Sequence, residues 1–350
     1  MIRVLVVEDS PVVREFLVYL LRADPEIDVV GTAANGERAV EAAQHLQPDV
    51  ITMDIHMPEM NGFDATRRIM ETAPTRIVIV SGSSTTEEIA TTFLALESGA
   101  LAVVKRPAGI GHPDHEATSR DLLQTVKLMS EVSVVRRWPS SRRAPPAAER
   151  LPEAGIKPAA AEVKLVAVGA STGGPLALQS ILAVLPKNLG VPILVVQHIS
   201  PGFTEGLAEW LTGSSGLPVH VAADGDHLAP GHVFIAPEGF QLGIRRGGTI
   251  SVARDEPENG HCPSISYLFR SVAEVFGAGA IGVLLTGMGR DGAAELKLMR
   301  EKGAITIAQD RESSVVHGMP GEAIRMGAAT HVLPLGQIAA ALSKLADKQQ

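Results

Sequence analysis

The 350-residue sequence has a single cysteine, Cys262, and aromatic residues make up only 3% of it. One cysteine excludes an internal disulfide and any zinc site that needs several thiolates. With so few aromatic rings, the core must be built from aliphatic side chains, as in parallel sheets buried on both faces. A platform of stacked aromatic residues for single-stranded nucleic acid is not indicated.

Two further absences limit the partners. The formal net charge is -8, and the chain has no dense block of Lys and Arg, which argues against nucleic acid or an anionic membrane surface as a partner. No apolar run reaches the length needed to span a bilayer, and the N-terminus turns acidic after one short apolar run. We therefore expect a cytoplasmic protein without direct membrane insertion.

A proline-rich stretch divides the sequence. Five prolines lie among Ala, Ser and Arg between about Ser133 and Glu162, and no regular element continues through so many prolines. We expect a flexible linker at 131–162 between domains at 1–130 and 163–350.

Apolar runs alternate with segments of helical period in both halves. This alternation predicts two α/β domains, each with a doubly wound parallel sheet whose ligands bind at the carboxyl ends of the strands. In the first half the predicted strands include Val4–Val7, Val50–Met53, Ile77–Val80 and Leu101–Val104, and the predicted helices include Val12–Leu21, Glu37–Leu46 and Glu87–Leu96.

The second half repeats the pattern and adds a hairpin. Gly247-Gly248 between Leu242–Arg245 and Thr249–Val252 predicts two short paired strands inserted in the α/β order. The other predicted strands are Leu165–Val168, Pro192–Val196, His232–Ile235, Ile281–Thr286 and Ala304–Ala308. The predicted helices are Leu176–Leu185, Thr204–Leu211, Ser264–Val275, Ala293–Glu301 and Gln337–Leu345.

Three acids follow predicted strands of the first half. Glu8 and Asp9 follow the first strand, and Asp54 follows Val50–Met53. Carboxylates gathered at one sheet edge offer the hard oxygen ligands that Mg²⁺ prefers, and a nearby hydroxyl and cation can hold a phosphoryl group. One such acid alone would be a helix cap, but the ordered set favours a functional site.

Residues 1–130 resemble response-regulator receiver domains. The resemblance rests on Glu8-Asp9, Asp54-x-x-Met57-Pro58-x-Met60-Asn61-Gly62, Ser81, and Gly99-Ala100 leading to a basic residue before Pro107. It implies a flavodoxin-like (βα)5 fold. It also implies that Asp54 accepts a phosphoryl group from a histidine kinase, with Mg²⁺ held by Glu8, Asp9, Asp54 and the backbone carbonyl of His56.

The same resemblance implies that Ser81 and one cation engage the phosphoryl group. Counted from Gly99 to Pro107, the position that receivers fill with lysine falls on Arg106, with Lys105 one residue earlier. Successive strand residues point to opposite faces, so only one of them can reach the phosphoryl group unless the chain bulges. We expect that residue to be Lys105.

The run Gly169-Ala170-Ser171-Thr172-Gly173-Gly174 follows an apolar strand and precedes a helical pattern. Glycines allow a sharp turn and leave N–H groups near the Ser171 hydroxyl, as an acyl-transfer nucleophile requires. A serine hydroxyl needs a neighbouring base, and the base needs an orienting carboxylate. His198 and Asp291 also follow predicted strands, so we expect three strand ends to bring these side chains together.

Residues 163–346 resemble the catalytic domain of chemotaxis response-regulator protein-glutamate methylesterases. The matching runs are Gly169–Pro175, Gln197–Thr204, Ala229–Pro237, Leu285–Ala293 and Val315–Pro320. The resemblance implies a Rossmann-like sheet and a phosphorylation-activated serine hydrolase that needs no cofactor for hydrolysis. Its substrates would be glutamate γ-methyl esters, and selected glutamines, in the cytoplasmic helices of chemoreceptors.

The methylesterase resemblance also implies a role for each site residue. Ser171 would be the nucleophile, His198 the general base and acid, and Asp291 the residue that orients His198. The backbone N–H of Met288 would stabilise the oxyanion, with Thr172 supporting the site.

Two other functions fit parts of the same pattern. Gly169–Ser171–Gly173 fits the Gly-x-Ser-x-Gly pattern of α/β-hydrolases, but the order here is Ser, His, Asp, whereas that fold has Ser, acid, His. The second alternative is a non-catalytic, phosphorylation-gated binding module whose glycine-rich loop cradles a phosphate. The glycine spacing is not Gly-x-Gly-x-x-Gly, and no Lys-Ser/Thr pair follows, so this alternative has weak support.

Overall fold

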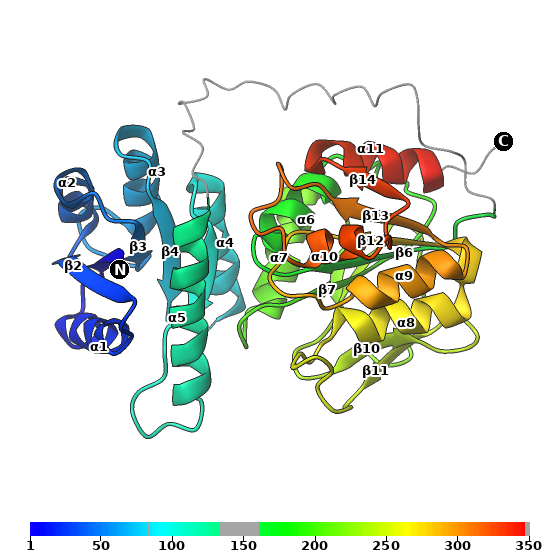
Figure 1. Cartoon of the computed structure of the whole chain (residues 1–350), viewed down its shortest axis with the longest axis horizontal. Helices are drawn as coiled ribbons and strands as arrows, with labels where there is room; N and C mark the ends of the chain where they lie inside the picture. The colour runs from blue at the N-terminus through cyan, green and yellow to red at the C-terminus, as the bar shows by residue number, and fades with distance from the viewer. Residues whose placement is uncertain (83–84, 133–160, 347–350) are drawn as a thin grey trace. The chain divides into compact units, whose positions relative to one another are not determined.

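The chain divides into two compact units, Met1–Arg143 and Ala144–Gln350. The computed structural model describes residues 1–82, 85–132 and 161–346. In Figure 1 the first unit runs from blue to cyan and the second from green to red. Most of the predicted linker at 131–162 lies outside the described residues.

The first unit is built around a five-stranded sheet of order β2-β1-β3-β4-β5 in which every pair is parallel. Its strands are β1 (Ile2–Val7), β2 (Ile27–Ala33), β3 (Val50–Met53), β4 (Arg76–Ser81) and β5 (Ala102–Lys105). Its helices are α1 (Pro11–Arg22), α2 (Gly36–Leu46), α3 (Gly62–Thr72), α4 (Thr86–Ser98) and α5 (His115–Glu131).

Local sequence explains how α3 starts beside the strand end that carries Asp54. The Asn61 side chain accepts a hydrogen bond from the backbone N–H of Asp64 at 2.9 Å, which caps the helix. Gly62 follows, and a Cβ there would lie 2.8 Å from the Cα of Ile55. Glycine therefore lets the start of α3 approach the end of β3 closely.

The second unit has a seven-stranded sheet of order β14-β13-β12-β6-β7-β9-β8, again with parallel pairs. Its strands are β6 (Leu165–Ala170), β7 (Ile193–Gln197), β8 (Val219–Val221), β9 (Val233–Ile235), β12 (Ala280–Leu284), β13 (Ile305–Gln309) and β14 (His331–Leu333). Strands β10 (Gln241–Ile244) and β11 (Ile250–Ala253) form a separate antiparallel hairpin.

Six α-helices in the described part of the second unit pack on its sheet. They are α6 (Gly174–Leu182), α7 (Thr204–Ser215), α8 (Ile265–Val275), α9 (Ala293–Glu301), α10 (Met319–Arg325) and α11 (Leu335–Ala346), with a short 3-10 turn at Gly277–Gly279. Helices α8, α9 and α10 are successive neighbours, and α6 contacts both α7 and α11 (Figure 1). Buried aliphatic residues and Phe269 fill the core between the sheet and α8.

The predicted fold class, two parallel α/β sheets and an inserted hairpin, is confirmed. The short strands β8 and β14 and the seven-residue helix α10 were not predicted. Each is too short to produce a clear hydrophobic period. Every helix in the described part of the chain falls short of the length or apolarity that crossing a membrane demands.

Gly169→Ala is expected to destabilise the second unit by about 1–3 kcal/mol, because an added methyl group would overpack a filled contact. A Cβ at Gly169 would overlap Ile265 Cγ2 and lie 3.0 Å from its Cδ1. The matched control is Gly213→Ala on an open part of α7, which should stabilise the protein by about 0.5–1 kcal/mol. Urea unfolding followed by circular dichroism measures both; equal stabilities would contradict this account of the packing.

Candidate functional site

Adjacent parallel strands bring Ser171 and His198 to the same sheet edge. Strand β6 pairs with β7, and Ala170 is in register with Gln197. The residues that follow them, Ser171 and His198, are therefore neighbours. The backbone N–H of His198 donates to the carbonyl of Ala170 at 2.9 Å. On the other side of β6, the Ser171 N–H donates to the carbonyl of Thr286 at 3.0 Å, just beyond β12.

A buried glutamine ties the two strand ends together. The Gln197 amide donates to the carbonyl oxygens of Ser171 at 2.8 Å and of His198 at 2.7 Å. A Cβ at Gly174 would lie 2.9 Å from both Gln197 Cδ and Ala170 Cβ. The second glycine of the Gly173-Gly174 pair is therefore required because this amide occupies the space beside it.

His198 and Asp291 form a close, sheltered pair. His198 Nε2 lies 3.0 Å from Asp291 Oδ2, and the side chains are 11% and 2% exposed. His198 Nδ1 is buried and has no hydrogen-bond partner among the described residues. The pair therefore leaves one ring nitrogen available as a base, and it is Nδ1.

Asp291 is surrounded by hydrogen-bond donors, three of which lie at the start of α8. Its Oδ1 accepts from Ser264 Oγ at 2.9 Å, Ser266 N at 3.2 Å and Asn259 Nδ2 at 3.1 Å. Its Oδ2 accepts from Ile265 N at 2.7 Å in addition to His198. The carboxylate thus receives the unpaired N–H groups at the N-terminus of a helix, where negative charge is favoured.

Two opposing effects set the pKa of Asp291. Burial raises it, but hydrogen bonds from His198, Ser266 and Ile265 together outweigh burial, and the pKa lies well below its usual range. Asp291 is therefore ionised at neutral pH and can stabilise a positive charge on His198.

The loop after β12 lies against the serine turn. The Thr286 hydroxyl oxygen lies 2.9 Å from the Thr172 carbonyl oxygen and accepts from the Val316 N–H at 2.9 Å. The Gly287 N–H donates to the Val316 carbonyl at 2.9 Å. In the described part of the chain, no hydrogen bond uses the N–H of Met288, so that donor is free to meet a developing negative charge.

The first unit gathers its three predicted acids. One carboxylate oxygen from each of Glu8, Asp9 and Asp54 lies within 4.8 Å of the others, and Glu8 and Asp54 are buried. Burial, followed by the charge of Asp54, raises the pKa of Glu8 to about 7. Burial also raises the pKa of Asp54, which the Arg106 guanidinium partly offsets. These hard oxygen ligands have little positive charge around them to balance their own, and such a set of ligands fits Mg²⁺.

Arg106 supplies the cation at this cluster. Its Nη2 lies 3.3 Å from Glu8 Oε2 and 3.5 Å from Asp54 Oδ1. Lys105 is paired in register with Ser81 at the end of β5 and makes no ion pair within the described residues. The structure therefore places Arg106 rather than Lys105 beside the acids, because successive residues along a strand present their side chains to opposite faces.

Ser81 ends β4 and is 1% exposed, and its hydroxyl lies 3.4 Å from that of Thr92. It stands at the carboxyl end of its strand, as Asp54 does on β3. His56, whose backbone carbonyl was predicted as a ligand, lies in the loop that follows Asp54.

Sequence reasoning missed the residues that surround the His198–Asp291 pair. Asn259, Ser264 and Ser266 contact Asp291, and the His261 ring stacks on His198. A serine before a predicted helix and an Asn-Gly pair are recognisable cap and turn signals. Neither signal says that the side chain reaches a distant aspartate.

The comparisons with known proteins match both units. The family model for the CheB methylesterase matches residues 166–342, and the model for the response regulator receiver domain matches residues 4–112. The crystal structure of the Thermotoga maritima CheB methylesterase catalytic domain aligns at a TM-score of 0.51 with 40% identity, over 53% of this chain and 100% of that one.

Full-length relatives agree with this division. A protein-glutamate methylesterase/protein-glutamine glutaminase of Nitrosospira multiformis is 61% identical, covering 99% of this chain and 97% of its own. A relative of the same description from Geobacter metallireducens is 56% identical over 99% of both chains. With a receiver domain followed by a CheB methylesterase domain, this chain belongs to the protein-glutamate methylesterase/protein-glutamine glutaminase family.

Proposed function

We propose that Ser171, His198 and Asp291 are the residues with which this methylesterase and glutaminase hydrolyses side-chain esters and amides. The observation that carries the proposal is the His198–Asp291 pair at 3.0 Å with His198 Nδ1 buried and free. Ser171 comes from the neighbouring strand end. The arrangement supports proton transfer from Ser171 Oγ to Nδ1, and the Ser–His hydrogen bond forms when substrate binds.

The reaction has two halves. Ser171 Oγ attacks the carbonyl carbon of a glutamyl γ-methyl ester while His198 takes its proton, and the ionised Asp291 stabilises the imidazolium. The Met288 N–H stabilises the oxyanion, and Thr172 supports the turn through its carbonyl contact with Thr286. His198 returns the proton to the departing methanol. Water then cleaves the acyl-enzyme and leaves glutamate.

The amide reaction uses the same tetrahedral intermediate. For a glutamine substrate, His198 protonates the departing ammonia, and the product is again glutamate. The substrates are methylated or amidated side chains on the cytoplasmic helices of chemoreceptors. Each turnover adds one negative charge to the receptor.

The receiver unit regulates this activity through Asp54. A histidine kinase supplies the phosphoryl group, and the residues that would hold Mg²⁺ are Glu8, Asp9, Asp54 and the carbonyl of His56. When bound, the metal supplies positive charge that favours phosphoryl transfer to the carboxylate. Arg106 and Ser81 then hold the phosphoryl oxygens, with Arg106 exchanging its present carboxylate partners for them.

Ser171→Ala is expected to lower methanol release from a methylated receptor fragment by at least about 10³-fold, because the nucleophile is removed. The matched control is Ser180→Ala on the exposed face of α6, which should keep wild-type activity. Methanol is measured by gas chromatography. Retention of activity by the Ser171 variant would exclude this serine as the nucleophile.

Arg106→Ala is expected to abolish most of the rise in esterase activity that a small acyl phosphate produces in the wild type. Lys105→Ala should keep the rise, because its neighbour holds the cluster. Asp54→Asn should show no rise in esterase activity when it is combined with either of these substitutions. If Lys105→Ala abolished the rise and Arg106→Ala kept it, Lys105 would be the residue that holds the phosphoryl group.

Mg²⁺ is expected to raise the melting temperature of the receiver unit more at pH 8 than at pH 6. The pKa of Glu8 is about 7 in the folded protein, against 4.5 for an ordinary glutamate. As pH rises, the unfolded chain therefore loses the Glu8 proton at a lower pH than the folded protein does. The stability of the folded protein falls between these two pH values. Above pH 7 the metal meets an ionised carboxylate and offsets that loss. Glu8→Gln should reduce the pH dependence of the Mg²⁺ shift in scanning calorimetry; an unchanged dependence would contradict the assignment.

A further inference from the structure

We propose that His261 is a positioning residue for His198. An ion pair between Arg270 and Glu258 holds the segment that carries His261 in place. This segment, Asp255–Pro263, lies between β11 and α8. The inference rests on the proposed function, since it assigns His261 a role through the catalytic base.

The two imidazole rings are stacked face to face. Their centroids are 3.9 Å apart and their planes differ by 8°. The hydrogen bond from His198 Nε2 to Asp291 holds a ring atom that lies close to the Cβ–Cγ axis, so it resists rotation of the ring about that bond only weakly. A ring in contact with the face of His198 blocks that rotation and holds Nδ1 in one orientation.

The backbone around His261 is a tight two-residue turn. Asn259 and Gly260 have φ angles of +54° and +81°, as a type I′ turn requires, and Asn-Gly is the preferred pair for it. Glu258 and His261 exchange both backbone hydrogen bonds, at 3.0 and 2.9 Å. The turn is therefore closed on itself before it meets the catalytic pair.

Asn259 connects the same turn to Asp291. Its Nδ2 donates to Asp291 Oδ1 and lies 3.1 Å from Ser266 Oγ, which in turn donates to Glu295 Oε2 at 2.6 Å. His261 and Asn259 thus contact the two members of the His198–Asp291 pair from one short segment.

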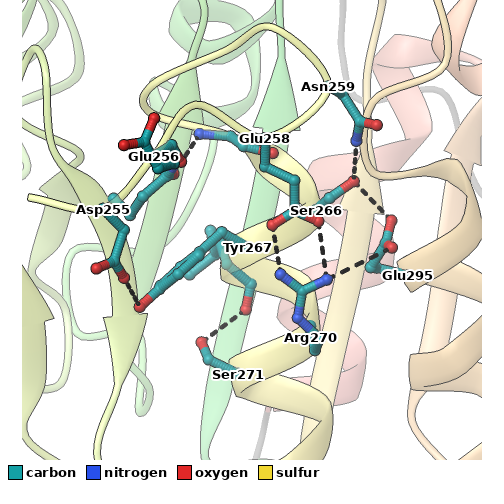
Figure 2. Close-up of polar contacts among 12 residues, drawn as sticks. Asp255, Glu256, Glu258, Asn259, Ser266, Tyr267, Arg270, Ser271 and Glu295 are labelled. Atoms are coloured by element: carbon teal, nitrogen blue, oxygen red, sulfur yellow. Dashed lines mark hydrogen bonds and ion pairs between the residues drawn. The ribbon is translucent and has the colours of Figure 1, made fainter. Parts of the chain in front are cut away.

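Arg270 on α8 anchors the turn to the core of the unit. Its guanidinium contacts both carboxylate oxygens of Glu258, with Nη1 at 2.8 Å from Oε1, and lies 3.9 Å from Glu295 Oε1. At the other end of the segment, the Tyr267 hydroxyl donates to Asp255 at 2.9 Å. Figure 2 shows these contacts converging on the first turns of α8. A bidentate pair of this kind fixes orientation as well as distance.

The environment of His261 favours its neutral form. Burial, and then the neighbouring His198, lower the pKa of His261, while Asp291 raises it. A neutral ring can remain stacked when His198 takes up the serine proton, whereas a second positive charge would oppose that step.

The test compares two substitutions at one position in the full-length chain. His261→Phe keeps a flat ring against His198, and His261→Ala removes it. We expect His261→Ala to lower kcat for methanol release by about 10- to 100-fold with KM changed less than about threefold. His261→Phe should recover most of the lost kcat. Glu256→Gln, at an exposed site in the same segment, is the control and should behave as wild type.

Arg270→Met removes the ion pair with Glu258 and should reproduce the kcat loss of His261→Ala. Melting temperatures show whether each variant is folded at the assay temperature. Wild-type kcat in folded His261→Ala, or equal impairment of the Ala and Phe variants, would overturn the proposal. These results are distinct from a failure of the proposed function, which would appear as full activity in Ser171→Ala.

Discussion

The buried carboxylate of Asp291 is the constraint on which the candidate active site depends. An ionised group with an exposed fraction of 2% would be strongly destabilising without compensation. Here the compensation comes from five donors, of which two are backbone N–H groups at the start of α8. The same charge therefore caps a helix, orients His198 and draws the Asn259 turn into the site. Loss of any one donor would disturb the others, because all share two oxygen atoms.

The chain contains a second buried acidic site with the opposite electrostatic balance. In the receiver unit, Glu8 and Asp54 have mainly Arg106 as a compensating partner, and their pKa values are raised. In the catalytic unit, many donors hold the pKa of Asp291 low. The first arrangement favours ligands that bring positive charge. The second needs no ligand to be stable, which suits a carboxylate that stays ionised.

Much of the site could be predicted because parallel sheets place all strand carboxyl ends at one edge. That rule was enough to group Ser171 with His198, and Glu8 with Asp54, from sequence alone. The predicted strand at Ile281–Thr286 overlaps β12 (Ala280–Leu284), so Asp291 was correctly expected beyond that strand. The rule gives positions along strands but not the direction of each side chain. Lys105 and Arg106 are adjacent in sequence, and only the orientation of the chain at the end of β5 determines that the second one meets Asp54.

Sequence alone determined the two α/β units, the family, and the identity of the acids, serine and histidine at the strand ends. Those features depend on local periodicity and on residue types, which a linear pattern records. The tertiary structure decided which His198 nitrogen faces Asp291, which donors keep that carboxylate ionised, and which ring lies on His198. These features arise where α8 and the Asp255–Pro263 segment pack against strands far away in the sequence. Contacts of that kind are fixed by how whole elements dock, and no local pattern carries that information.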